Sequence, residues 1–259
     1  MPLATLNGLS LYYETHGEGP PLVLLHGGLG PLTLFAAMVP PLAQRHQVIA
    51  VELQGHGHTA DIDRPLRYET LADDVAALVR HLGHPSVDIM GFSLGGGVAL
   101  QVALRHPALV RKLVVVSAPF RHLGWLPEIR AAMAQVSAAL LPAFENGPIY
   151  QAYAAVAPDP AHFAALLDKL GELMRQPYDW SAQVAQIAAP MLLIVGDADS
   201  IPPQEAAAMF ATLGGGQKDG GWMRENCIAS QLAILPATTH YSMASSPLVA
   251  PLALAFLAQ

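Results

Sequence analysis

Short apolar segments alternate along the chain with longer segments in which apolar residues recur every three or four positions. The short segments are bounded by glycine and proline and are almost wholly apolar, which is typical of strands that helices cover on both faces. Six such strands are predicted, at residues 22–25, 47–53, 87–90, 112–117, 191–195 and 231–235. The alternation therefore predicts repeated βαβ units and a mainly parallel sheet, that is, an α/β fold.

Helical periodicity marks the segments between these strands. Residues 71–82 carry apolar positions four, three and four apart, and Thr70 with Asp73 resembles a capping box at the start of that helix. Residues 202–213 form a second predicted helix, with proline at its start and glycine after its end. The last helix is expected to begin at Ser246, which a proline follows.

Three stretches depart from this alternation. Residues 4–15 predict a hairpin about Asn7-Gly8, a dipeptide favoured in two-residue turns. Residues 121–185 lack a strand pattern and are broken by prolines, so short helices are expected there. Residues 214–230 are rich in glycine, and a long loop of this kind usually lies on the surface or shapes a site.

Composition excludes several classes of protein. With 259 residues, 53% of them apolar and only 13% charged, the chain has enough apolar surface for a large core, so disorder is excluded as its main state. Thirteen Lys and Arg residues against 20 Asp and Glu residues give a net charge of −7, which provides no footprint for nucleic acid or an anionic membrane. The single cysteine, Cys227, excludes an intramolecular disulfide and a cysteine-based zinc site.

The apolar stretches are too short, or too interrupted by glycine, proline and histidine, for a transmembrane helix of about 20 residues. The first residues have neither the basic region nor the apolar region of a signal peptide. The expected protein is therefore soluble and cytoplasmic.

The main candidate for chemistry is the segment Gly91-Phe-Ser93-Leu-Gly95, a match to G-x-S-x-G. It follows a predicted strand and precedes a predicted helix, which is the context that this motif requires. A serine on such a sharp turn projects its hydroxyl above the sheet, and its flanking residues must be small because the backbones pack closely. The helix N-terminus beside it favours developing negative charge.

A serine hydroxyl becomes a good nucleophile only beside a base, and that base needs an orienting acid. Asp197 and Asp199 follow the strand at residues 191–195, and His240 follows the last strand. The carboxyl ends of strands are the edge at which open α/β sheets build their sites. Asp199 is the preferred acid because it stands three residues past Gly196, in the loop proper, whereas Asp197 is expected to shape the turn.

A further turn supplies candidates for an oxyanion hole. His26-Gly27-Gly28 follows the strand at residues 22–25, and a glycine turn there lets a backbone N–H point at a developing oxyanion. The two donors are assigned to the backbone N–H groups of Gly28 and Leu94. His26 is expected to hold this loop by hydrogen bonding and not to act as a second base.

Taken together, these motifs resemble the α/β-hydrolase superfamily over essentially the whole chain. The resemblance implies an eight-stranded, mostly parallel sheet flanked by helices and a triad of Ser93, His240 and Asp199. It also implies a helical cap at residues 121–185, between core segments at residues 1–120 and 186–259. The family's Asp after the fourth strand is Glu52 here, which affects only local loop packing. The motifs that carry the resemblance are LLHGGLG at 24–30, GHG at 55–57, MGFSLGG at 90–96, VGDADSIPP at 195–203 and ATTHYS at 237–242.

The function predicted from these residues is that of a serine carboxylesterase, which cleaves a small-molecule carboxylic ester through an acyl-enzyme on Ser93. Dehalogenases and epoxide hydrolases of the family use aspartate in place of this serine, and HGGLG lacks the proline typical of proline iminopeptidases. No organic cofactor is expected. His56 and His58 have no carboxylate or thiolate cluster beside them, so no metal is expected either.

Several alternatives stay open at this stage: a carbon–carbon bond hydrolase of vinylogous diketones, a lactonase, a cofactor-free perhydrolase, and a hydrolase-fold ligand receptor. The carbon–carbon hydrolase needs a cation in the cap to hold a carboxylate, and the candidates are Arg121, Arg130, Arg175 and Lys169. Eight of the 17 aromatic residues lie between residues 120 and 180. They either fill the core of the helical segment or line an apolar pocket for a small to medium apolar or aromatic ester.

Overall fold

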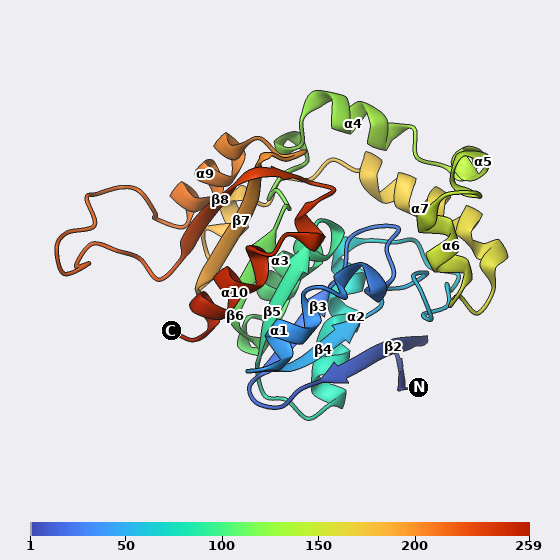
Figure 1. Cartoon of the computed structure of the whole chain (residues 1–259), viewed down its shortest axis with the longest axis horizontal. Helices are drawn as coiled ribbons and strands as arrows, with labels where there is room; N and C mark the ends of the chain where they lie inside the picture. Colours follow the sequence, from blue (N-terminus) through green and yellow to red (C-terminus); the bar gives the residue numbers. More distant parts are fainter. Residues whose placement is uncertain (1) are drawn as a thin grey trace.

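The computed structural model describes residues 2–259, except for the side chain of residue 34. Eight strands form one sheet with the order β1-β2-β4-β3-β5-β6-β7-β8 (Figure 1). From β3 to β8 every neighbouring pair is parallel, whereas β1 and β2 pair antiparallel to each other and β2 pairs antiparallel to β4. The strands are β1 (Leu3–Leu6), β2 (Leu9–His16), β3 (Pro21–Leu25), β4 (Gln47–Val51), β5 (Val87–Phe92), β6 (Val110–Val116), β7 (Met191–Ala198) and β8 (Gln231–Thr239).

The expected hairpin joins β1 to β2. Leu6 pairs with Leu9, and the two turn residues Asn7 and Gly8 have φ angles of 51° and 80°. Positive φ at both central residues is the conformation that a tight hairpin turn needs, and Asn and Gly are the residues that adopt it at least cost. The sequence prediction at this turn is confirmed.

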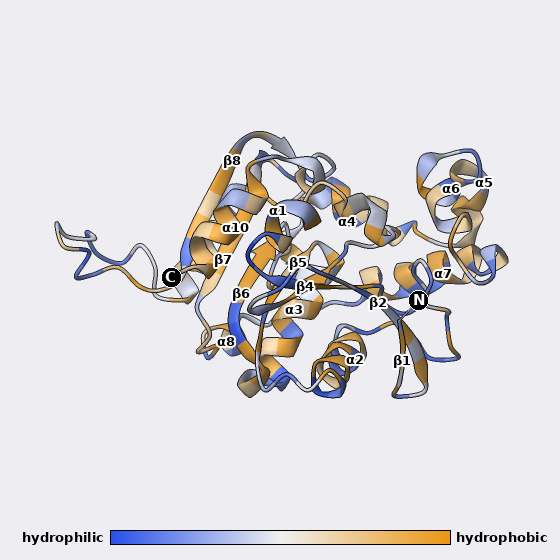
Figure 2. Ribbon diagram, turned by 60° about the horizontal axis from the view of Figure 1, so that its bottom comes forward, coloured by the Kyte–Doolittle hydropathy of each residue, from blue (hydrophilic) through white to orange (hydrophobic). Residues whose placement is uncertain are grey.

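Helices cover both faces of the sheet because successive residues of the parallel strands point to opposite sides. In β3, Leu22 and Leu24 pack in the core under α1 and α10, whereas Val23 and Leu25 pack in the core under α2 and α3. Figure 2 shows the strands at the centre in hydrophobic colours. The helices of these layers are α1 (Val39–Ala43), α2 (Tyr68–His81), α3 (Leu94–Arg105), α9 (Pro203–Thr212) and α10 (Val249–Leu257).

A separate group of helices, which we call the helical layer (residues 122–184), connects β6 to β7. It lies beyond the carboxyl ends of the central strands (Figure 1). Phe163 is fully buried at its centre and contacts the rings of Phe144, Tyr150 and Tyr153. The helices that lie beyond the carboxyl ends are α4 (Pro127–Ala134), α5 (Leu141–Phe144), α6 (Pro148–Ala154) and α7 (Phe163–Arg175). The last helix of the connection, α8 (Ser181–Val184), packs instead against α3 and α9 (Figure 2).

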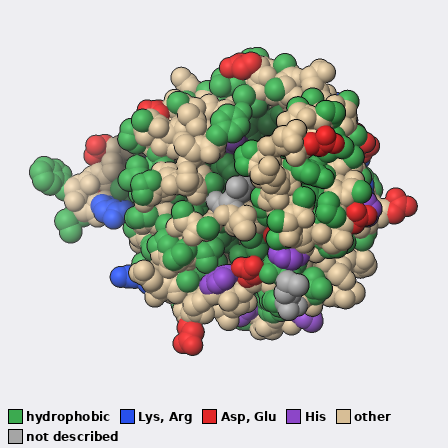
Figure 3. All heavy atoms as spheres, turned by 45° about the vertical axis from the view of Figure 1, so that its right-hand side comes forward, with side chains coloured by type: hydrophobic (Ala, Val, Ile, Leu, Met, Phe, Trp, Pro, Cys, Tyr) green, Lys and Arg blue, Asp and Glu red, His purple; other side chains and the backbone are tan. Residues whose placement is uncertain are grey.

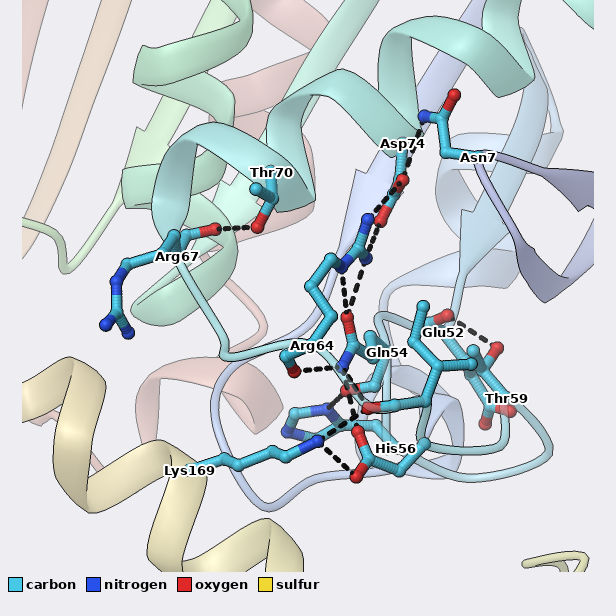
Figure 4. Close-up of polar contacts among 12 residues, drawn as sticks. Asn7, Glu52, Gln54, His56, Thr59, Arg64, Arg67, Thr70, Asp74 and Lys169 are labelled. Carbon is cyan, nitrogen blue, oxygen red and sulfur yellow. Dashed lines mark hydrogen bonds and ion pairs between the residues drawn. The ribbon is translucent and has the colours of Figure 1, made fainter.

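Polar contacts tie this layer to the body of the protein. The Lys169 ammonium on α7 donates to the Asp61 carboxylate and to the Ile62 carbonyl, both at 2.6 Å. The same loop is held from its other side, because Arg64 bonds both Gln54 and the buried carboxylate of Asp74 on α2 (Figure 4). The loop after β4 is therefore fixed between α2 and α7.

Two predicted helix starts are wrong. α2 begins at Tyr68, three residues before the expected start, and Thr70 lies inside it with its hydroxyl donating to the Arg67 carbonyl. Thr70 and Asp73 therefore form no capping box. α10 begins at Val249 and not at Ser246, because residues 243–245 form a separate 3-10 turn.

The glycine-rich loop at residues 214–230 lies on the surface. It joins α9 to the beginning of β8, which is the edge of the sheet opposite to the carboxyl ends of the strands. In Figure 1 it projects away from the body on the side remote from α5 and α6, and Trp222 at its tip is fully exposed. This loop therefore does not shape the site at the carboxyl ends.

Candidate functional site

The turn after β5 places Ser93 in a strained backbone conformation, with φ of 53° and ψ of −115°. Close backbone packing explains the glycines around it. A Cβ atom on Gly91 would lie 2.1 Å from the Gly95 carbonyl oxygen, and one on Gly95 would lie 2.4 Å from the Leu25 carbonyl oxygen. The G-x-S-x-G pattern is thus the sequence that lets β5 turn directly into α3 with the serine at its tip.

Three residues from three separate strand ends meet at this turn. Ser93 Oγ lies 3.0 Å from His240 Nε2, and His240 Nδ1 lies 2.9 Å from Asp199 Oδ1. A carboxylate only accepts, so Nδ1 carries the proton and Nε2 is left free to accept the serine proton. The geometry is that of a nucleophile beside an oriented base.

Asp197, the other carboxylate that the sequence offers as the acid, does not hydrogen-bond to His240. It is exposed, and its Oδ1 accepts the backbone N–H of Thr238 at 3.2 Å. The two carboxylates therefore have different contacts: Asp199 contacts His240, whereas Asp197, near the end of β7, bonds the backbone of β8.

Asp199 is 6% exposed and has donors on both oxygens. While His240 contacts Oδ1, Oδ2 accepts the Ser117 hydroxyl at 2.5 Å and the Gly196 N–H at 3.1 Å. Burial on its own raises the pKa of this carboxyl. The hydrogen bonds from His240 and Ser117 outweigh burial, so the pKa of Asp199 is lowered from its ordinary value.

The two amides assigned to the oxyanion hole lie at the same place. Gly28 and Leu94 line one cavity together with Ser93, and Leu94 is the first residue of α3. Among residues 2–259, neither the Gly28 N–H nor the Leu94 N–H is bonded to a protein acceptor. Both donors are therefore free for an oxyanion beside Ser93.

Two buried histidines hold the loops that surround these amides. His26 Nδ1 donates to the Gly27 carbonyl, and Nε2 accepts the Leu53 N–H. His56 Nε2 accepts the Leu29 N–H at 3.3 Å. Burial lowers the pKa of His26 to about 3 and that of His56 to about 4. Both rings are neutral near pH 7 and serve as loop supports, as the sequence predicted for His26.

Glu52 occupies the position where the family pattern has Asp. Its carboxylate is buried and accepts the backbone N–H groups of Leu32 and His58 and the ring nitrogen of His58. A Cβ at Gly57 would lie 2.2 Å from this carboxylate, so the longer acid is accommodated by glycine. The departure from the pattern changes loop packing and lies outside the contacts of Ser93.

The cavity above Ser93 is small, about 30 Å³, and mostly apolar. Polar groups enter it from Tyr68 and Tyr178 and from His122, which packs edge-on against the ring of Tyr178. The cavity is lined by Gly28, Tyr68, Ser93, Leu94, His122, Trp125, Met133, Leu170, Leu173, Met174 and Tyr178.

The aromatic residues of the helical layer divide between two roles. Phe144, Tyr150, Tyr153 and Phe163 pack against one another and form the core of the layer. Trp125 and Tyr178 line the cavity instead, where the Trp125 indole N–H donates to the Tyr178 hydroxyl at 3.3 Å. About half of the aromatic enrichment is thus structural packing.

None of the four cations proposed for a carboxylate substrate lines the cavity. Arg121 forms a two-pronged pair with Glu205, Lys169 pairs with Asp61, and Arg175 donates to backbone carbonyls of residues 134 and 136. Arg130, on α4, is not among the lining residues, and its Nε is buried without a hydrogen-bond partner in the described residues. The cavity lining therefore offers no Lys or Arg to hold an anion, and the face drawn in Figure 3 shows more carboxylates than cations.

Within residues 2–259, no three His, Cys, Asp or Glu side chains gather in a way that could hold a metal ion. No helix in the same range is long and apolar enough to cross a bilayer.

An eight-stranded sheet with a serine on the strand-to-helix turn, and a histidine and a carboxylate at neighbouring strand ends, defines a hydrolase of α/β architecture. The chain belongs to the α/β-hydrolase fold family, whose sequence pattern it matches over residues 20–259. The fold class predicted from the sequence is thereby confirmed.

Individual relatives differ in how much of their length is matched. A pimeloyl-[acyl-carrier protein] methyl ester esterase of Nitrosospira multiformis is 28% identical over 270 residues, covering 92% of this chain and 94% of that protein. A soluble epoxide hydrolase of Corynebacterium is 38% identical over 116 residues, but this match covers only 44% of this chain and 40% of the epoxide hydrolase. A thermophilic esterase from Thermogutta terrifontis superimposes with a TM-score of 0.74 at 24% identity, over 99% of this chain and 96% of that structure, which shows a shared fold.

Sequence reasoning missed several residues of the site. The sequence places Ser117 only at the end of a strand and assigns no role to Tyr68 or His122. Tyr178, by contrast, is among the aromatic residues that the sequence offers for an apolar pocket. A signal for Ser117 did exist: it is a hydroxyl residue directly after a buried strand, at the edge where Ser93, Asp199 and His240 were already expected.

Proposed function

We propose that this chain is a serine hydrolase that cleaves carboxylic esters with short, uncharged acyl groups. The observation that supports the proposal most directly is the continuous contact from Ser93 Oγ through His240 to Asp199, with free amides of Gly28 and Leu94 beside the serine. A positioned nucleophile, base and pair of oxyanion donors are the parts that acyl transfer needs.

In the acylation step, His240 Nε2 takes the Ser93 proton while Ser93 Oγ attacks the ester carbonyl carbon. The negative charge that develops on the carbonyl oxygen is stabilised by the N–H groups of Gly28 and Leu94. The ionised Asp199 stabilises the imidazolium through Nδ1–H. His240 then gives its proton to the leaving alcohol as the bond from carbon to the alcohol oxygen breaks.

Deacylation repeats these steps with water. His240 takes a proton from water, the resulting hydroxide oxygen attacks the acyl carbon on Ser93, and the same amides hold the oxyanion. The proton returns to Ser93 Oγ as the bond from carbon to that oxygen breaks, so the acid product leaves and the resting serine is restored.

The size and charge of the cavity support the short-acyl preference. The cavity is narrow, with about 30 Å³ open to the centres of water-sized spheres, which favours a short acyl group, and the flexible side chains of Met133 and Met174 form part of its wall. The cavity lining contains no Lys or Arg, which disfavours the carboxylate-bearing substrate of a carbon–carbon bond hydrolase. We also propose that the helical layer acts as the cap of the site.

The relatives fit this proposal unevenly. The methyl ester esterase matches over nearly its whole length and its name describes ester cleavage. The epoxide hydrolase matches over less than half, and the residue at the nucleophile turn of this chain is a serine, not the aspartate that epoxide opening uses in this family.

A panel of p-nitrophenyl esters from acetate to decanoate tests the proposal. We expect hydrolysis by the wild type with kcat/KM highest for acetate or propionate, and a loss on the order of 10⁴-fold or more in Ser93→Ala. Equal hydrolysis by wild type and Ser93→Ala would contradict the serine mechanism. A maximum at octanoate or longer would contradict the short-acyl preference alone.

A further inference from the structure

Ser117 stands between the two strand ends that carry Ser93 and Asp199. It is the first residue after β6, and β6 lies between β5 and β7 in the sheet. The carbonyl of Val116 accepts the Ser93 N–H at 2.9 Å, and the Ser117 N–H donates to the Ile194 carbonyl of β7 at 2.8 Å. The backbone at Ser117 is therefore bonded to both neighbours of β6.

The backbone conformation of Ser117 directs its side chain. Its φ angle is 49°, in the left-handed region that disfavours side chains, and the residue is completely buried. Glycine would fit this φ with less strain, yet the position carries a hydroxyl. Strain retained at a buried residue suggests that the side chain has a use.

The hydroxyl of Ser117 donates to Oδ2 of Asp199 at 2.5 Å. Only Oδ1 contacts His240, so the donors on Oδ2 determine how the carboxylate plane is turned about its Cβ–Cγ bond. Of the two, the Gly196 N–H belongs to β7, the strand that leads directly into Asp199. Ser117 is the donor that belongs to a different strand and so fixes the carboxylate against the sheet.

We propose that Ser117 is a positioning residue for the reaction: its hydroxyl holds Oδ2 of Asp199 so that Oδ1 stays directed at His240. This inference rests on the proposed function of Ser93, His240 and Asp199. Ser117 touches neither substrate nor the reacting atoms and acts only through the carboxylate. The titratable group in contact with Asp199 is His240, whereas Ser117 and Gly196 are neutral donors.

Two variants of Ser117 separate the effect of its hydroxyl from the effect of its strained backbone. Ser117→Ala keeps the same strained backbone and removes Oγ, whereas Ser117→Gly removes Oγ and relieves the strain. We expect kcat for p-nitrophenyl acetate to fall about 10- to 100-fold in both, with KM little changed, because a hydrogen bond to an ionised carboxylate is lost. Ser117→Gly also serves if the alanine variant folds poorly.

The pH dependence of kcat/KM distinguishes this role from a general loss of structure, which would lower the rate without shifting the profile. A carboxylate that loses a donor holds a proton more tightly, so the coupled His240–Asp199 pair gains proton affinity. The acid limb of kcat/KM should therefore move to higher pH by roughly one unit in both variants. A fraction of misfolded enzyme would lower the rate without moving this limb.

A double-variant cycle completes the test. If Ser117 acts through Asp199, adding Ser117→Gly to Asp199→Asn should cost less than about threefold further in kcat. Wild-type kcat and an unmoved acid limb in both single variants, or an equal loss with and without Asp199→Asn, would overturn the positioning role. Failure of the proposed function looks different, because the wild type itself would then neither hydrolyse esters nor lose activity on removal of the Ser93 hydroxyl.

Discussion

The carboxyl edge of the sheet and the helical layer above it are built in different ways. At the edge, each functional side chain has a defined hydrogen-bond partner, and the loops between them are held by buried polar residues such as His26 and His56. The helical layer is held mainly by apolar packing around Phe163, and a small number of polar contacts join it to the body, among them that of Lys169 with Asp61.

This difference separates two tasks. Hydrogen-bonded side chains on strand ends fix atoms to within a few tenths of an ångström, which acyl transfer needs. Apolar packing through flexible methionines and leucines constrains shape less strictly and can adapt to a substrate. In the proposed function, the edge performs the chemistry and the helical layer selects the ester.

The strongest test of the edge compares two neighbouring carboxylates. Asp199→Asn removes the ionised partner of His240 and should lower kcat on the order of 10⁴-fold. Asp197→Asn makes the same chemical change two residues away, where the side chain bonds only the Thr238 N–H, and should lower kcat less than about threefold. Steady-state kinetics on p-nitrophenyl acetate measures both. Similar losses in the two variants would mean that the edge does not act through Asp199.

A lower pH should reduce the free energy of unfolding because two buried histidines support the loops at the edge. The pKa values of His26 and His56 are about 3 and 4 in the folded protein, against an ordinary value of 6.5. The unfolded chain therefore binds protons below pH 6.5 that the folded protein does not bind, so stability falls as the pH falls. At pH 5 the loss is about 2 kcal/mol for each histidine, or about 4 kcal/mol in total, relative to pH 7.5.

Urea unfolding at pH 7.5, 6.0 and 5.0 measures this loss. A His56→Gln variant, although less stable at pH 7.5, should show about half of the pH dependence. A free energy of unfolding that stays constant between pH 7.5 and 5.0 would show that these rings are not held neutral.

The helical layer is best tested by changing the cavity wall. Met174→Ala, on α7, should raise the ratio of kcat/KM for hexanoate to that for acetate about 10-fold, because it adds room for one or two methylene groups. Met223→Ala makes the same change at the exposed loop tip and should leave the ratio unaltered. An unchanged ratio in Met174→Ala would show that this part of the cavity wall does not select the length of the acyl group.

The smallest expected effect concerns the attachment of the layer. Lys169→Met removes the bonds to Asp61 and the Ile62 carbonyl and should cost about 1 kcal/mol of local stability. Amides of α7 should then exchange hydrogen several-fold faster, with little change in kcat. Lys218→Met, on the glycine-rich loop, is the matched control and should leave α7 unaffected.

The sequence predicted the edge well because its signals are local. Ser93 stands in a motif whose glycines are required by backbone contacts, and His240 and Asp199 each follow an apolar strand. The parallel order of the sheet then brings these strand ends together. The predicted capping box at Thr70 is wrong because the helix begins earlier, at Tyr68, whose ring packs against Gly97 of α3.

Other features depend on contacts that no local pattern encodes. The bond from Ser117 to Asp199 joins residues 82 positions apart in the chain. The size of the cavity depends on how α4 and α7 pack over the sheet. About half of the aromatic residues that suggested a medium-sized pocket pack within the helical layer itself. Composition indicated an apolar site but not how much of the apolar surface was free.

Labelling with a fluorophosphonate, followed by peptide mapping, tests the central claim that His240 activates the Ser93 hydroxyl. We expect a single covalent adduct on the peptide that contains Ser93, no adduct in Ser93→Ala, and labelling slowed by on the order of 10³-fold or more in His240→Ala. An adduct on another residue, or equally fast labelling of Ser93 without the imidazole, would contradict the account.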